Sequence, residues 1–335
     1  MKLAFFEVEG WEEPLIRENF PNDEIFLSVE KLTASFLGTA GDSEVVSTMV
    51  GGMIDKSILE LFPKLKLFST RSTGYDHVDL AACKERGVSV VYVPGYGDNT
   101  VAEFVFGLIL ALMRKIYHSI DQVKESGSFS LAGLRGSDLK GKVLGIVGTG
   151  RIGKEVIAIA NGFRMQILAH DLFEDKAFAA GHGFQYVSLP ELLGNSHVVS
   201  LHCPHTKETH HLINKGNIAQ FRKGAYFVNT ARGGLVETAA LVEALQSGIL
   251  AGAALDVLEE EGDVKDEIQC LRRTSIEAEE LRVIIANHVL MKMPNVLITP
   301  HNAFNSEEAL RRICGITIEN IKKFLSGAPQ NTVPV

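Results

Sequence analysis

The chain has 335 residues, of which 46% are hydrophobic, and a formal net charge of -8 at pH 7. This length exceeds what one hydrophobic core usually supports, so the composition predicts two domains with enough apolar side chains to fill both. The acidic balance gives no electrostatic reason to expect nucleic acid or an anionic membrane as a partner. The longest apolar run, 104–113, is far shorter than a membrane span of about 20 residues.

The cysteines indicate the cellular compartment. The chain has four of them: Cys83, Cys203, Cys270 and Cys314. They form no C-x-x-C pair, and such unpaired thiols are typical of a reducing cytosol. Met1 and Lys2 lead directly into a strand-like segment, so no signal peptide is expected. We therefore expect a cytoplasmic protein.

The first hundred residues have the pattern of a small α/β domain. Helical or loop segments such as 55–62 and 80–86 separate its strands, and this alternation predicts a parallel sheet. The strands are expected at 2–8, 24–28, 44–50, 65–69 and 88–93.

A polar loop at 71–79 follows the fourth of these strands. Ligands bind at the carboxyl edge of such a sheet, and the amides of a glycine-containing loop can hold a carboxylate. The alternative is an ordinary strand-to-helix connection in which Gly74 serves the turn.

Proline and glycine residues then break the pattern and predict a hinge at 96–99. Thr100 and Glu103 form a capping box that is expected to open a long helix reaching about residue 120. This helix is apolar all round, so it must be covered on several sides. A second subunit is one candidate cover, and we expect a homodimer.

The stretch 143–171 carries the strongest motif of the chain. A short apolar strand at 143–147 leads into a glycine-spaced turn and then a helix-like run at 155–163. The first glycine permits the tight turn, the second lets phosphate approach, and the third lets the helix lie against the strand. Backbone amides and the helix dipole together suit a pyrophosphate. The turn reads Gly148-Thr149-Gly150-Arg151-Ile152-Gly153.

Asp171 closes the second strand of this unit, about 20 residues after the turn. A carboxylate there accepts both ribose hydroxyls of NAD and repels the 2′-phosphate of NADP. The alternative is that Asp171 merely ends a strand. Because the strand, turn, helix and acid occur together, the sequence predicts a site for NAD.

Further strands and helices alternate after residue 171 and complete a doubly wound sheet of the Rossmann type over about 100–300. Helices are predicted at 189–193 and 238–247. The last helix, 306–325, is expected to return to residues 1–99, which lack an evident final helix. The six strands are expected at 143–147, 166–169, 197–201, 225–229, 251–257 and 296–299.

The fold class that we predict is therefore α/β with two domains, each a parallel sheet flanked by helices. A Rossmann NAD-binding domain at 100–300 is inserted into a flavodoxin-like substrate domain formed by 1–99 plus 301–335.

Three polar residues follow predicted strand ends: Arg232, Glu261 and His301. Singly, each has an ordinary explanation, because Arg and Glu are usually solvated and a lone His is usually structural. Beside an NAD site they form a coherent chemical set. An imidazole can carry a proton near neutral pH, a carboxylate can favour its charged form, and a guanidinium can bind a substrate carboxylate through two points.

The chain resembles the D-isomer-specific 2-hydroxyacid dehydrogenases over nearly its full length, in both the order and the spacing of its motifs. The branch it most resembles is that of the D-lactate dehydrogenases, on the grounds of Pro94-Gly95-Tyr96, the ending at 300–304 and an insertion at 262–293. The matching segments are 71–79, 100–103, 148–153, 200–204 with Thr209, 229–233, 252–261 and 299–304.

The resemblance implies reduction of a 2-oxo acid, with pyruvate as the best candidate, to the D-2-hydroxy acid. It makes His301 the acid/base, Glu261 its partner and Arg232 the carboxylate ligand. The implied cofactor site contains Gly148, Gly150, Arg151, Ile152, Gly153, Asp171, Cys203, Pro204, Thr209, Thr230, Ala231, Arg232 and Asp256. The implied substrate site contains Thr73, Gly74, Tyr96, Arg232, His301 and Phe304.

Several points remain open at this level. His77 and Asn302 depart from the usual residues of the family, and Gly262 stands where many members have Pro. The insertion is amphipathic at 276–290 and has a candidate cap at Thr274. The substrate could instead be hydroxypyruvate, glyoxylate or a branched 2-oxo acid, and an NADH-sensing corepressor is the alternative of another class.

One cluster could be taken for a metal site: His202, Cys203, His205, His210 and His211. Its spacing fits no recurrent zinc pattern, and His202 is expected along a buried strand edge. We therefore predict no metal.

Overall fold

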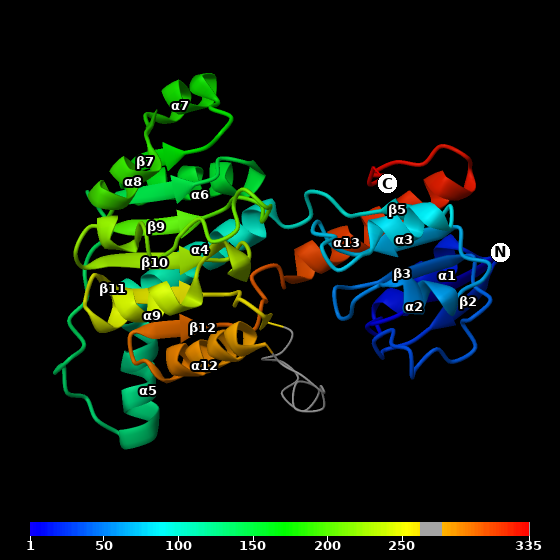
Figure 1. Cartoon of the computed structure of the whole chain (residues 1–335), viewed down its shortest axis with the longest axis horizontal. Helices are drawn as coiled ribbons and strands as arrows, with labels where there is room; N and C mark the ends of the chain where they lie inside the picture. The colour runs from blue at the N-terminus through cyan, green and yellow to red at the C-terminus, as the bar shows by residue number, and fades with distance from the viewer. Residues whose placement is uncertain (262–276, 335) are drawn as a thin grey trace. The chain divides into compact units, whose positions relative to one another are not determined.

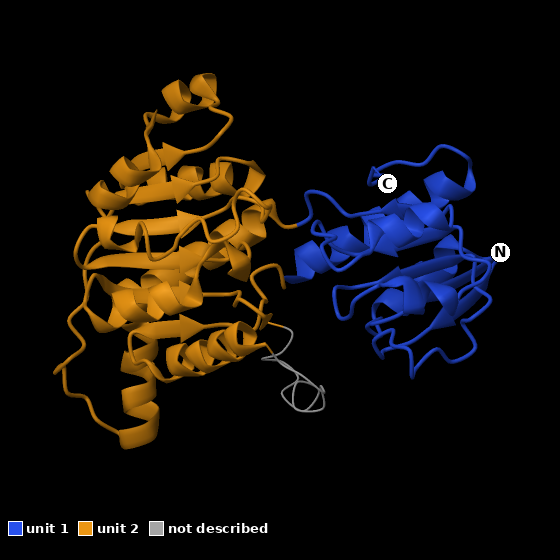
Figure 2. Cartoon of the chain, viewed as in Figure 1, with its two compact units in different colours: residues 1–96, 306–335 blue, residues 97–305 orange. Residues whose placement is uncertain are grey.

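The computed structural model describes residues 1–261 and 277–334. The chain forms two compact units (Figures 1 and 2). Unit 1 combines Met1–Tyr96 with Ser306–Val335, and unit 2 is Gly97–Asn305. The segment from 301 to 305 therefore belongs to unit 2, whereas the sequence placed it in the smaller domain. The reason is a hydrogen-bonded anchor on Asp256, described below.

Unit 1 is built on a five-stranded parallel sheet with the order β2-β1-β3-β4-β5. This is the flavodoxin-like order. Its strands are β1 (Lys2–Phe5), β2 (Glu24–Leu27), β3 (Val45–Thr48), β4 (Leu67–Thr70) and β5 (Ser89–Val91).

Both faces of this sheet are covered. Leu3 and Phe5 point to a core shared with α1 (Glu12–Asn19) and α13 (Glu307–Leu325). Ala4 and Phe6 point to the opposite core, formed with α2 (Lys56–Glu60) and α3 (Leu80–Glu85). The period-two alternation of strand side chains thus fills both layers. The C-terminal helix supplies the last helix that residues 1–96 lack.

Unit 2 is built on a seven-stranded parallel sheet with the order β12-β11-β10-β9-β6-β7-β8. The direction of winding reverses between β6 and β9, as in a Rossmann fold. Its strands are β6 (Val143–Val147), β7 (Gln166–His170), β8 (Gln185–Tyr186), β9 (Val198–Leu201), β10 (Ala225–Asn229), β11 (Leu250–Leu255) and β12 (Val296–Ile298).

The sequence missed one of these strands, β8. It contains only two residues, which is too short for an alternating pattern to be visible. It forms because Tyr186 pairs with Ala169 of β7 at the sheet edge.

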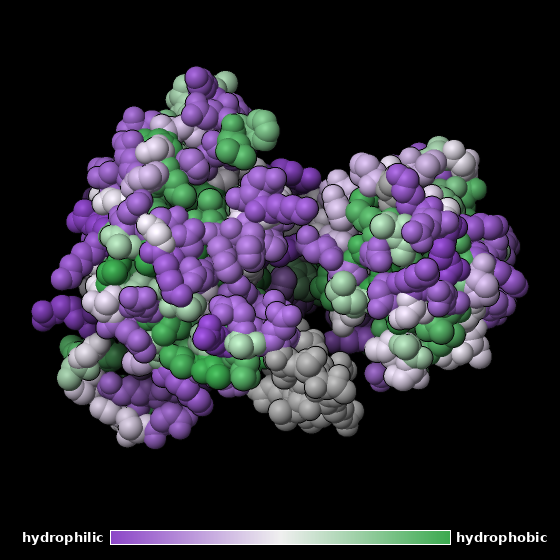
Figure 3. Space-filling model, in the orientation of Figure 1, coloured by the Kyte–Doolittle hydropathy of each residue, from purple (hydrophilic) through white to green (hydrophobic). Residues whose placement is uncertain are grey.

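Helices cover both faces of the larger sheet as well. One core contains α4 (Asp98–Met113) and α6 (Arg151–Gly162), and the other contains α8 (Leu189–Asn195) and α9 (Thr238–Gln246). The remaining elements are α5 (Ile116–Ser126), α7 (Lys176–His182), α12 (Ala278–Lys292) and the 3-10 turns η1 (Ile218–Gln220) and η2 (Gly233–Leu235). Figure 3 shows hydrophobic side chains gathered over α12, where Leu281, Ile285 and Met291 are exposed.

The prediction of one long helix from Thr100 was wrong at both ends. The helix α4 begins at Asp98 after Gly97, and Glu103 accepts a hydrogen bond from Asn99 Nδ2 instead of closing a capping box. The helix ends at Met113 because Lys115 adopts a left-handed conformation with φ of 55°, and α5 follows. No Gly or Pro marks this break in the sequence.

The apolar α4 is packed against α6 and the sheet. No helix in the described part of the chain is long and apolar enough to cross a membrane. The candidate cap at Thr274 lies outside the described residues, and the helix α12 begins at Ala278.

Candidate active site

The glycine turn after β6 has the geometry expected of a phosphate cradle. Gly148 has φ of 96°, and a Cβ there would lie 2.6 Å from Cys203 N, so the turn packs directly against the chain leaving β9. A Cβ on Gly153 would overlap the Gly148 carbonyl oxygen. Gly150 precedes α6 and has open space where a Cβ would stand. The backbone of the α6 N-terminus is thus accessible to an anion.

Neighbouring residues hold this end of α6. Arg151 Nε lies 2.8 Å from Asp98 Oδ2 at the start of α4. Ile152 packs against the core that contains α4 and α6. These two predicted cofactor residues therefore join the phosphate turn to the first helix of unit 2.

Asp171 follows β7 directly and is held by backbone and side-chain donors. Its Oδ2 accepts hydrogen bonds from Thr149 N at 2.6 Å and Thr149 Oγ1 at 2.9 Å, and its Oδ1 accepts one from Phe173 N at 2.9 Å. Partial burial would raise the pKa of Asp171, but these hydrogen bonds outweigh it and lower the pKa below its usual value. The group is therefore an ionised acceptor.

The segment after β9 forms a neutral wall near this carboxylate. Burial, with a smaller contribution from Asp171, raises the pKa of the Cys203 thiol to about 11. Thr209 Oγ1 donates to Pro204 O at 2.7 Å and accepts from Thr206 N at 2.7 Å, which fixes the shape of the loop.

The histidine-rich cluster does not assemble into a metal site in the described residues. No group of three or more His, Cys, Asp or Glu side chains there is arranged to hold a metal ion. Burial lowers the pKa of His202 to about 4, so its imidazole is neutral. His205 Nε2 lies 3.1 Å from His210 Nδ1, and His210 stacks on His211.

Arg232 lies on the loop after β10, and Asn229 shapes this loop. Asn229 Nδ2 donates to Arg232 O at 2.8 Å, and Ala231 N donates to Asn229 Oδ1 at 3.0 Å. Arg232 Nη1 donates to Ala231 O at 2.8 Å. Thr230, the next predicted cofactor residue, is buried. The half-buried guanidinium is therefore carried by a loop with a defined backbone.

The loop after β11 contacts the Arg232 loop closely. A Cβ on Gly233 would overlap the Leu258 carbonyl, so only glycine allows this approach. Glu259 Oε1 lies 2.5 Å from His211 Nε2, and Glu259 Oε2 accepts from Thr238 Oγ1 at 2.7 Å. Glu259 was not among the residues predicted from the sequence, although it lies two residues before Glu261. Glu259 connects three segments around the site.

Glu261 and His301 come together. His301 Nδ1 lies 3.1 Å from both carboxylate oxygens of Glu261. The side chain of His301 is 32% exposed and that of Glu261 is 21% exposed, so the pair is reachable from solvent. A carboxylate only accepts, so the Nδ1–H donates to it, and Nε2 is the ring nitrogen that can give or take a proton. The φ of His301 is 56°, a left-handed value that a non-glycine residue rarely adopts.

Asp256 holds the segment that carries His301. Its buried carboxylate accepts hydrogen bonds from Thr299 Oγ1 at 2.5 Å, Asn302 N at 3.0 Å and Ala303 N at 2.9 Å. The resemblance included Asp256 in the cofactor site. In the structure this carboxylate positions the backbone around His301.

The site residues of unit 2 follow the order of its strands. The turn with Gly148, Asp171 and Cys203 follow β6, β7 and β9, which are neighbours in the sheet. Arg232, the Glu261 segment and the His301 segment follow β10, β11 and β12, which are also neighbours. The predicted cofactor residues and the predicted catalytic residues therefore lie at the carboxyl edge of the same sheet. Phe304 is half-buried just beyond Ala303.

The predicted substrate residues of unit 1 lie at the carboxyl edge of its own sheet. Thr73 Oγ1 donates to Val93 O at 2.8 Å, and Ser72 Oγ donates to Gly74 O at 2.5 Å. Tyr96 O accepts from Arg312 Nε at 2.5 Å. His77 stands where the family usually has Asn, and its Nε2 lies 3.3 Å from Thr70 Oγ1.

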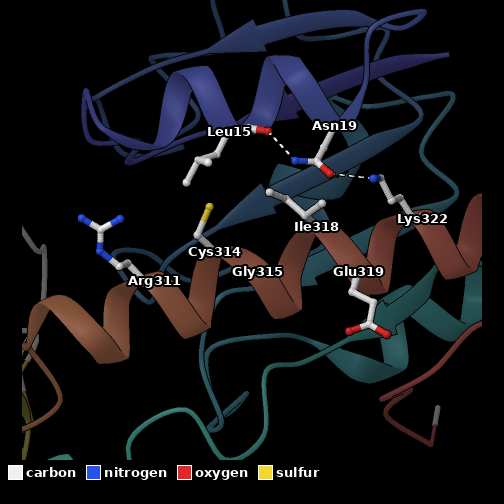
Figure 4. Close-up of a pocket in the computed structure, with 8 residues that line it drawn as sticks. All are labelled: Leu15, Asn19, Arg311, Cys314, Gly315, Ile318, Glu319 and Lys322. Carbon is white, nitrogen blue, oxygen red and sulfur yellow. Dashed lines mark hydrogen bonds between the residues drawn. The ribbon is translucent and has the colours of Figure 1, made fainter.

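A surface pocket of about 330 Å³ lies elsewhere in unit 1, where α1 and α13 face each other (Figure 4). Lys322 Nζ donates to Asn19 Oδ1 at 2.6 Å at one end of it. None of the predicted site residues lines this pocket. Its lining residues are Leu15, Asn19, Arg311, Cys314, Gly315, Ile318, Glu319 and Lys322.

The Rossmann order, the glycine turn and the ionised Asp171 define an NAD-binding α/β protein, in which Glu261 and His301 form a hydrogen-bonded pair. The family model for the D-isomer specific 2-hydroxyacid dehydrogenase NAD binding domain matches residues 106–303.

Known proteins agree. D-lactate dehydrogenase from Escherichia coli (strain K12) is 34% identical over 98% of this chain and 98% of its own length. Aromatic 2-oxoacid reductase from Clostridium sporogenes is 38% identical over 80% of this chain and 78% of its own length. The structure of D-lactate dehydrogenase from Aquifex aeolicus complexed with NAD and lactic acid has a TM-score of 0.83 and 33% identity, and it covers 97% of this chain and 96% of that chain.

The chain belongs to the D-isomer-specific 2-hydroxyacid dehydrogenase family, on the D-lactate dehydrogenase branch, and NAD is its cofactor. The predictions of family, fold class and cofactor are confirmed.

Proposed function

We propose that this NAD-dependent dehydrogenase reduces pyruvate to D-lactate. The observation that supports it most is the Glu261–His301 pair, in which one ring nitrogen is held by a carboxylate and the other is left to exchange a proton. The bound dinucleotide supplies or takes up the hydride at the carbonyl carbon of the substrate. The chain must then supply the proton for the carbonyl oxygen, and His301 Nε2 is the group for that task.

Glu261 supports this proton transfer by holding the imidazole ring. Its carboxylate lies 3.1 Å from Nδ1 and accepts the Nδ1–H. It also fixes the ring orientation, so that Nε2 is presented in a constant direction. After the proton leaves, the neutral imidazole is the base for the reverse reaction.

Arg232 is the proposed ligand of the substrate carboxylate. A guanidinium binds a carboxylate through two parallel hydrogen bonds, and its charge polarises the adjacent carbonyl. Asn229 shapes the loop that presents it. We assign the backbone amides of Thr73 and Gly74 and the Tyr96 hydroxyl as further carboxylate donors, and Phe304 as a limit on side-chain size.

The remaining cofactor assignments follow the order of the sheet edge in unit 2. Gly148, Gly150, Arg151, Ile152 and Gly153 are assigned to the pyrophosphate and Asp171 to the adenosine ribose. The wall beside the adenosine is assigned to Cys203, Pro204 and Thr209, and the nicotinamide half to Thr230 and Ala231. Asp256 is assigned to the support of the neighbouring His301 segment instead of a direct cofactor contact. Unit 1 is the proposed substrate domain.

A larger 2-oxo acid is the second candidate substrate. A relative that covers 80% of this chain is named aromatic 2-oxoacid reductase. The residues that set the size of a side-chain pocket differ from those that carry out the reaction, so the same catalytic set serves either substrate. Hydroxypyruvate, glyoxylate and branched 2-oxo acids are further candidate substrates on the same grounds.

The decisive experiment follows the loss of NADH absorbance with a panel of 2-oxo acids. We expect the highest kcat/KM with pyruvate, far lower activity with NADPH, and in reverse the oxidation of D-lactate but not L-lactate. If an aromatic or branched acid has a higher kcat/KM than pyruvate, that acid is the preferred substrate and the assignment of pyruvate is wrong. Tight NADH binding without turnover of any 2-oxo acid would contradict the proposal and favour an NADH-sensing corepressor.

We also propose that the protein is a homodimer through its NAD-binding domain. The support is α5, which has no buried residue and exposes Ile116, Tyr117, Ile120 and Val123, all at helical spacing. Light scattering at micromolar concentration should give twice the mass of the chain. A monomeric mass would contradict this proposal.

Finally, we place the protein in the cytoplasm. Cys83, Cys203 and Cys314 are free thiols, as expected in a reducing compartment. Burial raises the pKa of Cys83 and Cys314 to about 11, which keeps both thiols protonated.

A further inference from the structure

The Asp171 carboxylate stands at the end of a chain of hydrogen bonds that starts on another element. Asp175 N lies 3.1 Å from the Tyr186 hydroxyl, which lies 2.9 Å from Thr149 Oγ1. Thr149 Oγ1 in turn lies 2.9 Å from Asp171 Oδ2. The chain therefore connects the edge strand β8 with the phosphate turn and with the carboxylate that follows β7.

The direction of these hydrogen bonds can be derived from the number of hydrogens available. An ionised carboxylate only accepts, so the single hydroxyl hydrogen of Thr149 goes to Asp171. Thr149 Oγ1 must then accept from Tyr186, whose own hydrogen is thereby used. The Tyr186 oxygen accepts the backbone N–H of Asp175. In this direction every donor and acceptor of the series has a partner. The series runs from Asp175 N through the two hydroxyls and ends at the charged Asp171 carboxylate.

Tyr186 is anchored well enough to act as a fixed donor. It pairs with Ala169 in the sheet, and its ring packs at 5.4 Å from the ring of Phe184. Asp175 is the N-cap of α7, where it accepts from Phe178 N, and it is paired with Lys154 of α6 at 2.6 Å. The residues at the donor end of the series are thus held in place by contacts with β8, α6 and α7.

The consequence is a carboxylate with little rotational freedom. A carboxylate offers about four acceptor positions. Thr149 occupies two on Oδ2 and Phe173 N occupies one on Oδ1. A 2′-phosphate could be tolerated only if this charge turned away, and turning away would break both hydrogen bonds from Thr149. The rigid charge therefore strengthens the selection between the two dinucleotides.

We propose that Thr149 and Tyr186 are specificity-determining residues for the cofactor, because they hold the Asp171 carboxylate in the orientation that leaves its remaining acceptor position on Oδ1 to a ribose hydroxyl of NAD and rejects the 2′-phosphate of NADP. Thr149 occupies a position of the glycine turn at which the motif specifies no residue type. Tyr186 lies outside the motif.

The test measures dissociation constants for NADH and NADPH by fluorescence titration of the whole protein without substrate, so it is independent of which 2-oxo acid is reduced. Tyr186→Phe keeps the ring and removes the hydroxyl, and Thr149→Val keeps the branched shape. Thr149→Ser, which keeps the hydroxyl, is the matched control. Circular dichroism and thermal melting verify folding of each variant.

We expect Tyr186→Phe to lower the preference for NADH over NADPH about threefold to tenfold and Thr149→Val to lower it at least about tenfold, whereas Thr149→Ser stays close to wild type. In the Thr149→Val background, Tyr186→Phe should have no additional effect on the preference, because the series is already broken.

Two results would overturn the proposal. One is an unchanged preference in both Tyr186→Phe and Thr149→Val. The other is an equal loss of affinity for both dinucleotides, which would mean that the two residues only support the phosphate turn. Should Thr149→Val fail to fold, Tyr186→Phe with the Thr149→Ser control decides by the same criterion.

Discussion

The replacement Asp256→Asn tests how the position of His301 is maintained. Asp256 accepts three hydrogen bonds, from Thr299 Oγ1, Asn302 N and Ala303 N. An asparagine has only one acceptor oxygen. Its NH2 group would therefore face at least one of these donors, which would lose its acceptor. Hydrogen bonds to charged groups are worth about 1.5–3 kcal/mol each, and the carboxylate is buried. We therefore expect the variant to lose ~2–3 kcal/mol of stability.

The same change should reduce the catalytic rate. Asn302 directly follows His301, so loss of the anchor displaces the imidazole, and a misplacement of about 1 Å typically costs on the order of a hundredfold. We expect kcat to fall about a hundredfold while the dissociation constant for NADH changes less than about threefold. Thermal melting should fall by roughly 4–10 °C.

Two comparisons make this prediction specific. Thr299→Val removes one of the three hydrogen bonds and leaves both backbone amides bonded, so its loss of kcat should be much smaller. A large rise in the NADH dissociation constant of Asp256→Asn would show a direct contact with the cofactor. A folded variant with wild-type kcat would refute the positioning role.

Three further substitutions separate the proposed roles in catalysis. His301→Ala should lower turnover by about two to four orders of magnitude without loss of NADH binding, and unchanged turnover would remove this residue from the mechanism. Arg232→Lys should raise KM for the 2-oxo acid far more than the NADH dissociation constant, because Lys lacks the two-point fork; equal effects on both would argue against it. Glu261→Gln keeps the length of the side chain but can place an amide NH2 where the Nδ1–H needs an acceptor, so kcat should fall about tenfold to a hundredfold while the NADH dissociation constant stays close to wild type. A wild-type kcat would exclude Glu261 as the residue that holds His301.

Local features of this protein were predictable because their cause is local. The glycine turn needs a short strand, three glycines and a helix within about a dozen residues, and Asp171 lies at a fixed distance from it. The proposal of Arg232, Glu261 and His301 as catalytic residues rests on the position of a polar residue after each of three strands, and the pairing of Glu261 with His301 is seen in the structure. The family resemblance then supplied the order of these segments.

Features that depend on which strands become neighbours were not predictable in this way. The Asp256 anchor joins residues more than forty positions apart, and the Glu259–His211 contact spans a similar separation. The two-residue strand β8 exists because Gln185 and Tyr186 pair with Leu168 and Ala169 of β7. The break at Lys115 was also missed, since nothing in the local pattern opposes a continuous helix.

The sequence by itself determined the class of fold and the cofactor and proposed the residues of the candidate site, because glycine spacing, charge and apolar periodicity act over short distances along the chain. Only the tertiary structure decided how those residues are held. A hydrogen bond between distant segments depends on the pairing and register of the strands that carry them, and this pairing is a property of the whole sheet.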